Sequence, residues 1–454
     1  MPIIRHSAGL AALNACLLVA CSLTGQSLSA EEMPPGGLCT QEQMQLEQQR
    51  MKLMDHPIIQ ATRKSVREIY EKSPLANTTA GAETLDAALD AHIAAMLNHA
   101  VNFDSAKPRA LWATNAAHEW NHTHISNSGY GIENPDNVYR HIPLDSQSTY
   151  LLKGRWHKGY EPAQQTFTFY SSLPGMKSMN VEGSPLAAAF ANPTLTENGE
   201  FEVTIDKGHI TGSNLDIKPH SLIALLIVRD TIADWSNQYA TELSIERITD
   251  SAERTLDTDH KQAIEAAEYI TKSVPFWYDY NEQFIYSRPV NTIYPPRERG
   301  TGWGFSTSGH FQIPREHSLV VTLNRFEAPY LGFQLTDPWG VASEYVTATG
   351  SLNHNQAKHN ADGSITYVIS ATDPGVHNWL DTGGLDRGLF AIRWQGANAK
   401  ALDINAAVIE VRMVPLENLL SELGTNAYPT SPEERRLQIQ KRAQNYAIRL
   451  CGHG

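Results

Sequence analysis

Apolar side chains recur at three- and four-residue spacing over residues 39–101, which is the period of an amphipathic helix. A face of this kind predicts packing against a hydrophobic core and not a ligand site. The polar run Asn-Thr-Thr-Ala-Gly at 77–81 is expected to divide the region into two helices. The side chains that form the face are Leu85, Leu89, Ile93, Met96, Leu97 and Ala100.

From Val138 onward the pattern changes to short alternating or β-branched runs, which predict strands separated by turns. A helix is expected to interrupt them over residues 259–282, where apolar positions recur among charged ones. The expected fold class is therefore mainly β with helical additions (α+β), built on an antiparallel sandwich or barrel core. The predicted strands are 149–152, 166–170, 201–205, 222–228, 318–323, 365–370, 388–394 and 407–414.

The carboxy-terminal segment carries a complete helix start signal. Ser431 suits the N-cap, Pro432 the first helical position, and Glu434 can close a capping box with Ser431. Gly452 can end this helix. Because Pro, Gly and Thr are frequent over 289–309, we expect a boundary between structural units there. The expected organisation is a signal peptide (1–30), a helical region (31–129), a first β-rich unit with a helix (130–288), a second β-sandwich unit (289–430) and a terminal helix (431–454).

The first thirty residues have the basic, apolar, polar order of a secretion signal. Their apolar part, about fifteen residues, is shorter than the roughly twenty that a membrane-spanning helix needs. Two cleavage sites remain open. Cleavage after Ala30 would release the chain, whereas cleavage before Cys21, which follows a lipobox-like Leu-Val-Ala, would leave a lipidated cysteine. We expect export to the periplasm of a Gram-negative bacterium, or anchoring in its outer membrane as a lipoprotein, with no transmembrane span.

The positions of the cysteines and the net charge add expectations about a disulfide and about binding partners. Outside the signal, only Cys39 and Cys451 remain, one near each end of the chain. An oxidising compartment would let them pair, although two unpaired thiols remain the alternative. Such a bond would close a loop of about four hundred residues and contribute on the order of 5 kcal/mol in the chain-entropy model. The net charge of −13 argues against nucleic acid as a partner. The sequence does not indicate an oligomeric state.

Patches over residues 130–415 resemble a bacterial family of unknown function, the domain-of-unknown-function "twelve-fourteen" proteins. This resemblance implies a β-sandwich fold and no established reaction or substrate. Its most specific part is Asn-Trp-Leu-Asp-Thr at 378–382. The patches are 134–139 (Asn-Pro-Asp-Asn-Val-Tyr), 150–155 (Tyr-Leu-Leu-Lys-Gly-Arg), 332–335 (Gly-Phe-Gln-Leu), 338–339 (Pro-Trp), 351–353 (Ser-Leu-Asn), 362–364 (Asp-Gly-Ser), 373–382 and 393–394 (Arg-Trp).

The segment 373–381 brings carboxylate, imidazole, amide and indole groups together around a Pro-Gly turn. Asp373, His377 and Asp381 are candidate acid and base residues, and Trp379 is a candidate stacking surface for a sugar or another flat ligand. The alternative is structural, with Asp373 organising the turn, Trp379 filling the core and Asp381 bonded to a neighbouring loop.

Further candidate ligand contacts come from Asn378 and Arg393, and from Asp136, Asn137 and Tyr139 in the first matched patch. Asp136 also suits a purely turn-forming role. Arg393 precedes Trp394 in a predicted strand, so the two side chains should point to opposite faces of the sheet. If Arg393 points inward, it needs a carboxylate partner, and Asp381 is a candidate.

His118-Glu119-Trp120-Asn121-His122 matches the His-Glu-x-x-His pattern that binds zinc when it lies on a helix, and His124 lies close by. The turn-forming residues 127–129 follow almost at once, and no third ligand appears at the expected spacing. A surface or interface histidine cluster is therefore the alternative. Zinc is the one cofactor that the sequence suggests, and it belongs to this hypothesis alone.

Three functions remain open from the sequence. The first is an exported β-sandwich protein that binds or acts on a small molecule or glycan through the loops 134–139 and 373–381. The second is a zinc-dependent hydrolase that uses His118, Glu119 and His122. The third is a non-catalytic envelope protein whose polar and aromatic loops serve packing only.

Overall fold

The computed structural model describes residues 37–120, 122–176, 186–206, 209–249, 258–299, 303–398 and 402–451. The predicted signal peptide, with Cys21, and the predicted helix-ending Gly452 lie outside the described residues, as does the side chain of Cys451. No helix of the described part combines the length and apolar character needed to cross a bilayer.

The amino-terminal region forms three helices, α1 (Gln41–Met54), α2 (Pro57–Tyr70) and α3 (Thr79–Asn102), so the expectation of two was wrong. The additional break arises at His56, whose ring nitrogen accepts from the amide of Ile58 at 3.2 Å, and at Pro57, which begins α2. The predicted apolar face of α3 is confirmed as a packing face, because every one of its side chains is at most 4% exposed.

The first β-sandwich begins earlier than the boundary at residue 129, because the chain already enters its sheet at β1. One sheet has the order β1 (Leu111–Thr114), β4 (Asn137–Pro143), β11 (Leu225–Thr231), β6 (Gln164–Tyr170), β7 (Leu186–Ala191). The other has the order β10 (Leu215–Ile217), β9 (His209–Gly212), β8 (Glu200–Asp206), β5 (Tyr150–Arg155), β12 (Glu242–Arg247). Phe167, Phe169, Leu226 and Val228 lie in the core between them.

The second β-sandwich follows the helix α4 (Asp259–Tyr280) and its π-helical extension η2 (Asn281–Ile285). Its larger sheet has the order β13 (Arg297–Glu298), β14 (Gly304–Gln312), β20 (Arg387–Gln395), β16 (Tyr330–Thr336), β17 (Ser351–Asn353). The facing sheet has the order β19 (Trp379–Asp381), β18 (Ile365–Ser370), β15 (His317–Leu323), β21 (Val408–Pro415). Every predicted strand overlaps one of these strands or one of the first sandwich, and mainly β with helical additions is the observed class.

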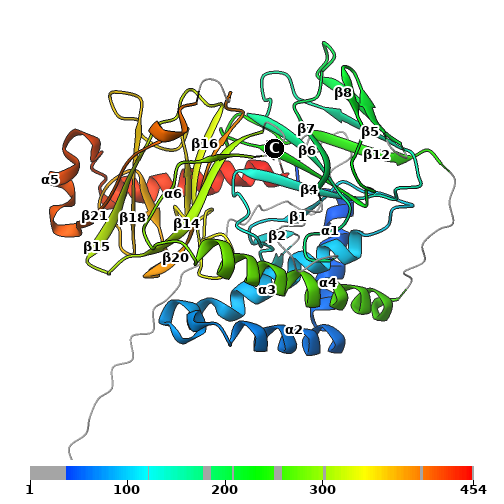
Figure 1. Ribbon diagram of the computed structural model, residues 1–454, viewed down its shortest axis with the longest axis horizontal. Coiled ribbons are helices and arrows are strands. Elements are labelled where there is room, and N and C mark those ends of the chain that lie inside the picture. The colour runs from blue at the N-terminus through cyan, green and yellow to red at the C-terminus, as the bar shows by residue number, and fades with distance from the viewer. Residues whose placement is uncertain are drawn as a thin grey trace, which may run out of the picture.

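The two sandwiches lie side by side, with α2, α3 and α4 beneath them (Figure 1). Leu225 and Ile227 of β11 pack into one core with α3 and α4, so the helices cover the outer face of the first sandwich. In the second sandwich, Leu389 and Ala391 on the outer face of β20 pack against Ile132 and Ile285. The outer faces of two sheets from different sandwiches therefore approach the same helical layer.

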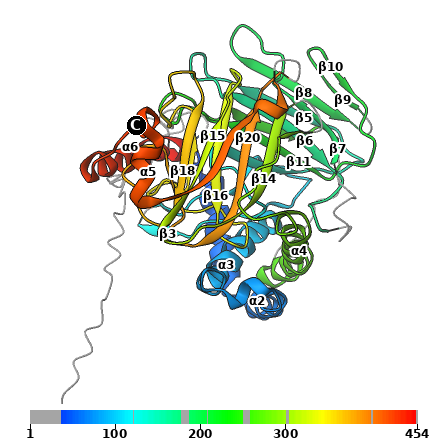
Figure 2. The ribbon, with the colours of Figure 1, turned by 60° about the vertical axis from the view of Figure 1, so that its left-hand side comes forward.

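The terminal helix α6 (Pro432–Cys451) runs from the second sandwich toward the first (Figures 1 and 2). The predicted capping box is confirmed, since the Ser431 hydroxyl accepts from the Glu434 amide at 3.3 Å and the Glu434 carboxylate accepts from the Ser431 amide at 2.8 Å. Near its other end, the carbonyl of Leu450 accepts from the amide of Cys39 at 2.9 Å. The remaining short elements are β2 (His118–Trp120), β3 (Thr123–Ile125), α5 (Leu419–Leu423) and the 3₁₀ turns at Pro74–Asn77, Ile404–Ala406, Leu416–Asn418 and Gly424–Asn426.

Candidate functional site

The polar groups of the segment 373–381 are engaged with the protein itself. Asp373 accepts from the amide of Gly375 at 2.9 Å and pairs with Arg435 of α6 at 3.0 Å. The ring of His377 contacts the carbonyl of Gln356 at 3.2 Å, and burial lowers the pKa of this imidazole. Asp381 accepts from the amide of Gly383 at 2.8 Å, and burial raises its pKa.

The amide and indole of this segment are structural in the same way. Asn378 is 3% exposed and bonds to both backbone groups of Lys358 and to the carbonyl of Thr366. Trp379 is buried, donates to the carbonyl of Ser370 at 3.1 Å and lies under the guanidinium of Arg435. These contacts favour the structural alternative for the segment, in which it holds the start of α6.

Asp136 is a buried junction between the two sandwiches. It is 1% exposed and accepts from Trp235 at 2.6 Å, from Asn353 at 2.9 Å and from the hydroxyl of Tyr330 at 2.8 Å. Asn137, also buried, contacts Asn134 and the hydroxyl of Tyr139. Because the Asp136 oxygens are used in this way, the geometry favours its structural role over ligand contact.

The two segments that the sequence places in one pocket lie at opposite ends of α6. Arg435 contacts Asp373, whereas Arg449 donates to the carbonyl of Pro135 at 2.5 Å. These arginines are fourteen residues apart on a regular helix, which corresponds to about 21 Å at 1.5 Å per residue. The contacts along α6 therefore do not join the two segments into a shared pocket.

The His-Glu-x-x-His pattern does not lie on a helix. His118 and Glu119 belong to β2, which pairs with β3, and His124 lies opposite Glu119. The His118 ring is buried, with the Glu47 carboxylate 3.0 Å from Nε2 and the carbonyl of Ala116 2.8 Å from Nδ1, whereas His122 and His124 are exposed. The helix that the zinc hypothesis requires is absent, because the chain reverses inside the pattern, between β2 and β3, where His122 has a positive φ of 65°. In the described ranges no three such side chains gather as metal ligands.

Arg393 points away from the core of its sandwich, and its partners differ from the expected Asp381. Its guanidinium donates to the side-chain oxygen of Gln334 and to the carbonyl of Ile132. Trp394, its neighbour, is fully buried on the opposite face, as the alternation predicts. Arg393 is thus half-buried where the second sandwich approaches the first.

Two more arginines gather at Trp303, and one of them, Arg299, is near enough to Arg393 for the charge of Arg393 to lower its pKa. Arg229, near the end of β11, lies over the rings of Tyr139 (5.5 Å) and Trp303 (5.4 Å). Arg299, whose amide continues the β13 ladder by donating a hydrogen bond to the carbonyl of Gly304, lies 4.4 Å from the centre of the same Trp303 ring. We call Arg229, Arg299, Arg393 and Trp303 the inner arginine cluster. Its members come from both sandwiches, which are joined here by a hydrogen bond from Gln164 to the carbonyl of Trp303.

In the part of the chain that the structure describes, the inner arginine cluster lacks an ion-paired carboxylate. The charge of Arg393 acts on the carboxyl of Glu133, but burial raises the pKa of that carboxyl to about 8. Burial, followed by the charges of Arg393 and Arg229, lowers the pKa of Arg299 to about 10. Half-buried like charges are costly unless a counter-charge joins them. The arrangement is therefore suited to receiving an anion.

Two buried hydrogen-bond donors at the cluster also lack a partner among the described residues. They are the indole N–H of Trp303 and the side-chain N–H of Gln395, two residues beyond Arg393. A buried donor without an acceptor costs about 1–3 kcal/mol. Anionic oxygens would satisfy both donors.

A cavity of about 510 Å³ opens beside the cluster on the outer face of the larger sheet of the second sandwich. Ser306 lines it and is the ladder partner of both Arg297 and Arg393. The volume falls within the range of small-molecule sites, roughly 300–1,000 Å³. We call this cavity the outer pocket. Its walls include Tyr280, Arg288, Tyr294, Arg297, Ser306 and Ser308.

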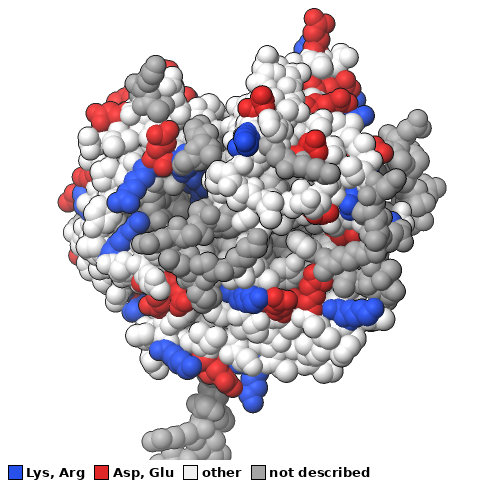
Figure 3. Space-filling view, turned by 45° about the vertical axis from the view of Figure 1, so that its right-hand side comes forward, with Lys and Arg blue, Asp and Glu red and all other residues white. Residues whose placement is uncertain are grey.

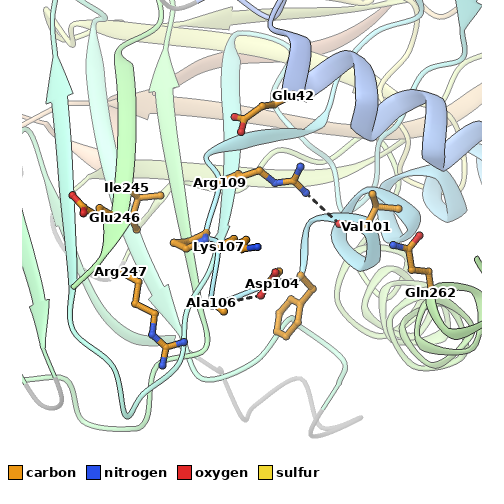
Figure 4. A pocket seen from close by; sticks show the side chains of 12 residues that line it. Glu42, Val101, Asp104, Ala106, Lys107, Arg109, Ile245, Glu246, Arg247 and Gln262 are labelled. Carbon is orange, nitrogen blue, oxygen red and sulfur yellow. Dashed lines mark hydrogen bonds between the residues drawn. The ribbon is translucent and has the colours of Figure 1, made fainter. Parts of the chain in front are cut away.

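Another cavity, of about 650 Å³, has a balanced lining. Glu42, Asp104 and Glu246 face it together with Lys107, Arg109 and Arg247 (Figure 4). On the face of the molecule in Figure 3, acidic and basic side chains are likewise mixed. Neither this cavity nor this face favours a ligand of one charge. The inner arginine cluster differs from them because its charged groups are all positive.

Comparison with known proteins finds a similar fold elsewhere but gives no information on the reaction or the ligand. No family model and no curated protein matches this chain. Its fold, however, recurs. The chain is similar to the crystal structure of an uncharacterised protein from Burkholderia cenocepacia, with a TM-score of 0.61 and 20% identity over 82% of this chain and 99% of that one. A protein from Vibrio parahaemolyticus has a TM-score of 0.38 and 12% identity, over 62% and 90% of the two chains.

The sequence singled out two members of this region, Arg393 and Tyr139, and missed Arg229, Arg299 and Trp303. The missed residues come from separate elements, so no local motif contains them. One signal was available, since Arg229 is a charged residue directly after the apolar run 225–228. The adjacent Asp230 is paired with Arg140, which leaves Arg229 without a carboxylate from its own strand.

Proposed function

We propose that this chain is an exported protein that binds a small anionic molecule between its two β-sandwiches. The observation that carries the proposal is the inner arginine cluster. Among the described residues, its three half-buried arginines lack an ion-paired carboxylate, and two buried N–H donors beside them lack an acceptor. A guanidinium pairs with a carboxylate or phosphate through two parallel hydrogen bonds, and these charge-assisted bonds are stronger than neutral ones.

Aromatic rings complete the proposed site. Tyr139 and Trp303 hold the guanidinium of Arg229 by cation–π contacts, and Tyr170 accepts from it at 3.4 Å. Such rings also offer flat apolar surface to the organic part of a ligand. Tyr139 and Arg393 thus keep the ligand-binding roles proposed from the sequence, whereas Asp373, His377 and Asp381 take structural ones.

Export of the chain remains part of the proposal, with the signal-like residues 1–30 as its support. A disulfide between Cys39 and Cys451 is proposed with it. Its support is the backbone amide of Cys39, which donates to the carbonyl of Leu450, the residue next to Cys451. Lipidation at Cys21 and membership of the "twelve-fourteen" family remain proposals from the sequence.

Binding of benzoate, phenyl phosphate and neutral benzamide to the purified mature chain tests the proposal, by calorimetry at constant ionic strength. We expect the two anions to bind and benzamide, which has nearly the shape of benzoate, to bind at least ten-fold more weakly. Arg299→Gln and Arg393→Gln should each weaken the anions by about ten-fold, the effect of one charge-assisted bond.

Arg315→Gln is the matched control, because Arg315 is exposed and lies in a turn of the second sandwich. It should leave the affinities unchanged. Equal binding of benzoate and benzamide, or full affinity in the double variant of Arg299 and Arg393, would reject the anion site and favour a non-catalytic envelope role.

A further inference from the structure

The positive charge at the site continues beyond the inner arginine cluster. Arg297 and Arg299 are two residues apart along one extended strand, so their side chains point to the same face of the sheet. Their Cα atoms are about 7 Å apart at the rise of a β-strand. Arg297 is exposed, lines the outer pocket, and forms no ion pair within the described part of the chain.

The sheet register links the outer pocket to the cluster. Ser306 of β14 lies between Arg297 of β13 and Arg393 of β20, and all three side chains are on the outer face. Neighbouring strands are about 4.8 Å apart, so Arg297 and Arg393 are separated by roughly 10 Å across the sheet. The guanidinium of Arg393 is held by Gln334 of β16, on the side of β20 that faces away from β14 and Arg297. The two charged groups are therefore directed apart and do not converge on a single small oxyanion.

Aromatic rings and one further arginine line the space beside these positions. Arg288 is engaged there, because its guanidinium donates to the carbonyl and the hydroxyl of Ser308. Tyr280 and Tyr294 line the outer pocket, and Tyr280 stacks on Phe284 at 5.4 Å. Tyr294 and Phe284 are themselves exposed, at 44% and 37%. Exposed aromatic side chains at the rim of a pocket favour a ligand with apolar or ring-bearing surface.

We propose that the ligand carries two anionic groups, one held by the inner arginine cluster and the other by Arg297, with an apolar or ring-bearing body along the tyrosines of the outer pocket. This inference rests on the proposed function and adds the class of ligand, a dicarboxylate or an equivalent bis-oxyanion. Arg297 acts as a specificity residue that distinguishes two-headed from one-headed anions.

The test compares α,ω-dicarboxylates of increasing length, from malonate to sebacate, with octanoate, in calorimetric titrations of the full mature chain. Suberate and octanoate have the same number of carbons and differ in one terminal carboxylate. We expect an optimum at an intermediate length, with suberate binding about ten-fold more tightly than octanoate. Arg297→Gln should remove this advantage and leave octanoate unchanged.

The outcomes separate the two proposals. If octanoate and all dicarboxylates bind equally, the second subsite is overturned and the anion site stands. If suberate is preferred but Arg297→Gln keeps the preference, Arg297 does not hold the second carboxylate. If neither octanoate nor any dicarboxylate binds, the anion site itself fails and the inference falls with it. Arg297 is exposed, so the variant should fold, and its circular dichroism and melting curve verify this.

Discussion

Arg299 is placed where its charge is expected to cost stability in the free protein. Its guanidinium is half-buried near two others, and burial and their charges lower its pKa. The pairing of Arg140 with Asp230 shows the contrasting case, in which a buried arginine has its counter-charge within the fold. This contrast between Arg299 and Arg140 is what the proposed anion would remove.

Replacing Arg299 by Gln is therefore expected to stabilise the ligand-free protein, by about 0.5–2 kcal/mol, the usual gain when a strained functional residue is relieved. The gain comes from removing one of three repelling charges. Chemical unfolding without added anion measures it, with Arg315→Gln as the neutral control. A variant that is less stable than the parent would show that the Arg299–Trp303 contact outweighs the repulsion.

Buried titratable groups make stability depend on pH in two opposite ways. Burial raises the pKa of Glu133 to about 8 and of Asp337 to about 7, so both keep a proton that the unfolded chain has lost, and stability falls as the pH rises toward 8. Burial lowers the pKa of His92 and His99 to about 3 and of His354 to about 4. The unfolded chain takes up protons at these histidines below pH 6.5, so stability also falls on acidification.

The free energy of unfolding should therefore be highest near pH 6.5. Below pH 6.5 the effect of the histidines exceeds that of the two carboxyls, because the three histidines outnumber them and burial lowers the pKa of His141 as well. The free energy of unfolding therefore falls on acidification. Glu133→Gln replaces a protonated carboxyl by a neutral amide and should make the decline above pH 6.5 shallower. Denaturant titrations between pH 5 and 9 measure this, with exposed Glu298→Gln as the control. An unchanged alkaline decline in the Glu133 variant contradicts the assignment.

Among the elements, α6 links parts of the molecule that are distant in sequence. Arg435 pairs with Asp373, Arg442 donates to the Ser351 hydroxyl at 2.9 Å, and Arg449 reaches Pro135. Arg442 and Arg449 also lie over the Trp235 ring, at 4.4 and 4.7 Å. One helix thus fastens the first sandwich to the second through evenly spaced arginines.

Removing the cap of α6 should weaken this fastening. Ser431→Ala loses the hydroxyl that accepts from the Glu434 amide and is expected to cost about 1 kcal/mol. Ser65→Ala is the control, because Ser65 is exposed within α2 and alanine suits a helix interior. A loss of stability in the Ser65 variant equal to that in the Ser431 variant would show that the cap has no specific role.

The elements were largely predictable because their signals are local. Ser431, Pro432 and Glu434 determine the start of α6 by short-range hydrogen bonds, and alternation in β20 places Trp394 inward and Arg393 outward. The site was not predictable in this way. Arg229, Arg299 and Arg393 meet only because two sheets approach one helical layer, and the separation of Asp136 from Asp373 depends on the path of α6. These positions depend on the packing of segments that are distant in the sequence, and a short stretch of sequence does not predict such packing.

At the scale of the whole molecule, the amino-terminal segment before α1 lies beside the end of α6. If Cys39 and Cys451 are bonded, as proposed, the bond closes a loop of about four hundred residues. Its loss in the Cys39→Ser/Cys451→Ser double variant should cost on the order of 5 kcal/mol in the chain-entropy model.

Mass spectrometry of the unreduced and reduced mature protein tests the bond, and denaturant unfolding of the parent and the double variant measures the cost. A free thiol at Cys39 in the unreduced protein would refute the pairing. Mass spectrometry also identifies the mature amino-terminus. A lipidated Cys21 would support the anchored form, whereas a terminus at Glu31 would exclude it.

The position of α6 at the end of the chain has a consequence for how the protein is assembled. A ribosome makes the chain from the amino-terminus, and domains fold as units while later segments are still absent. Both sandwiches are complete in sequence before the first arginine of α6 exists. The helix that fastens them is therefore expected to dock late in assembly, onto surfaces that have formed before it. A chain cut short by twenty residues would keep its two cores and lose one of the connections between them, while the contacts of Asp136 with Tyr330 and Asn353 would remain.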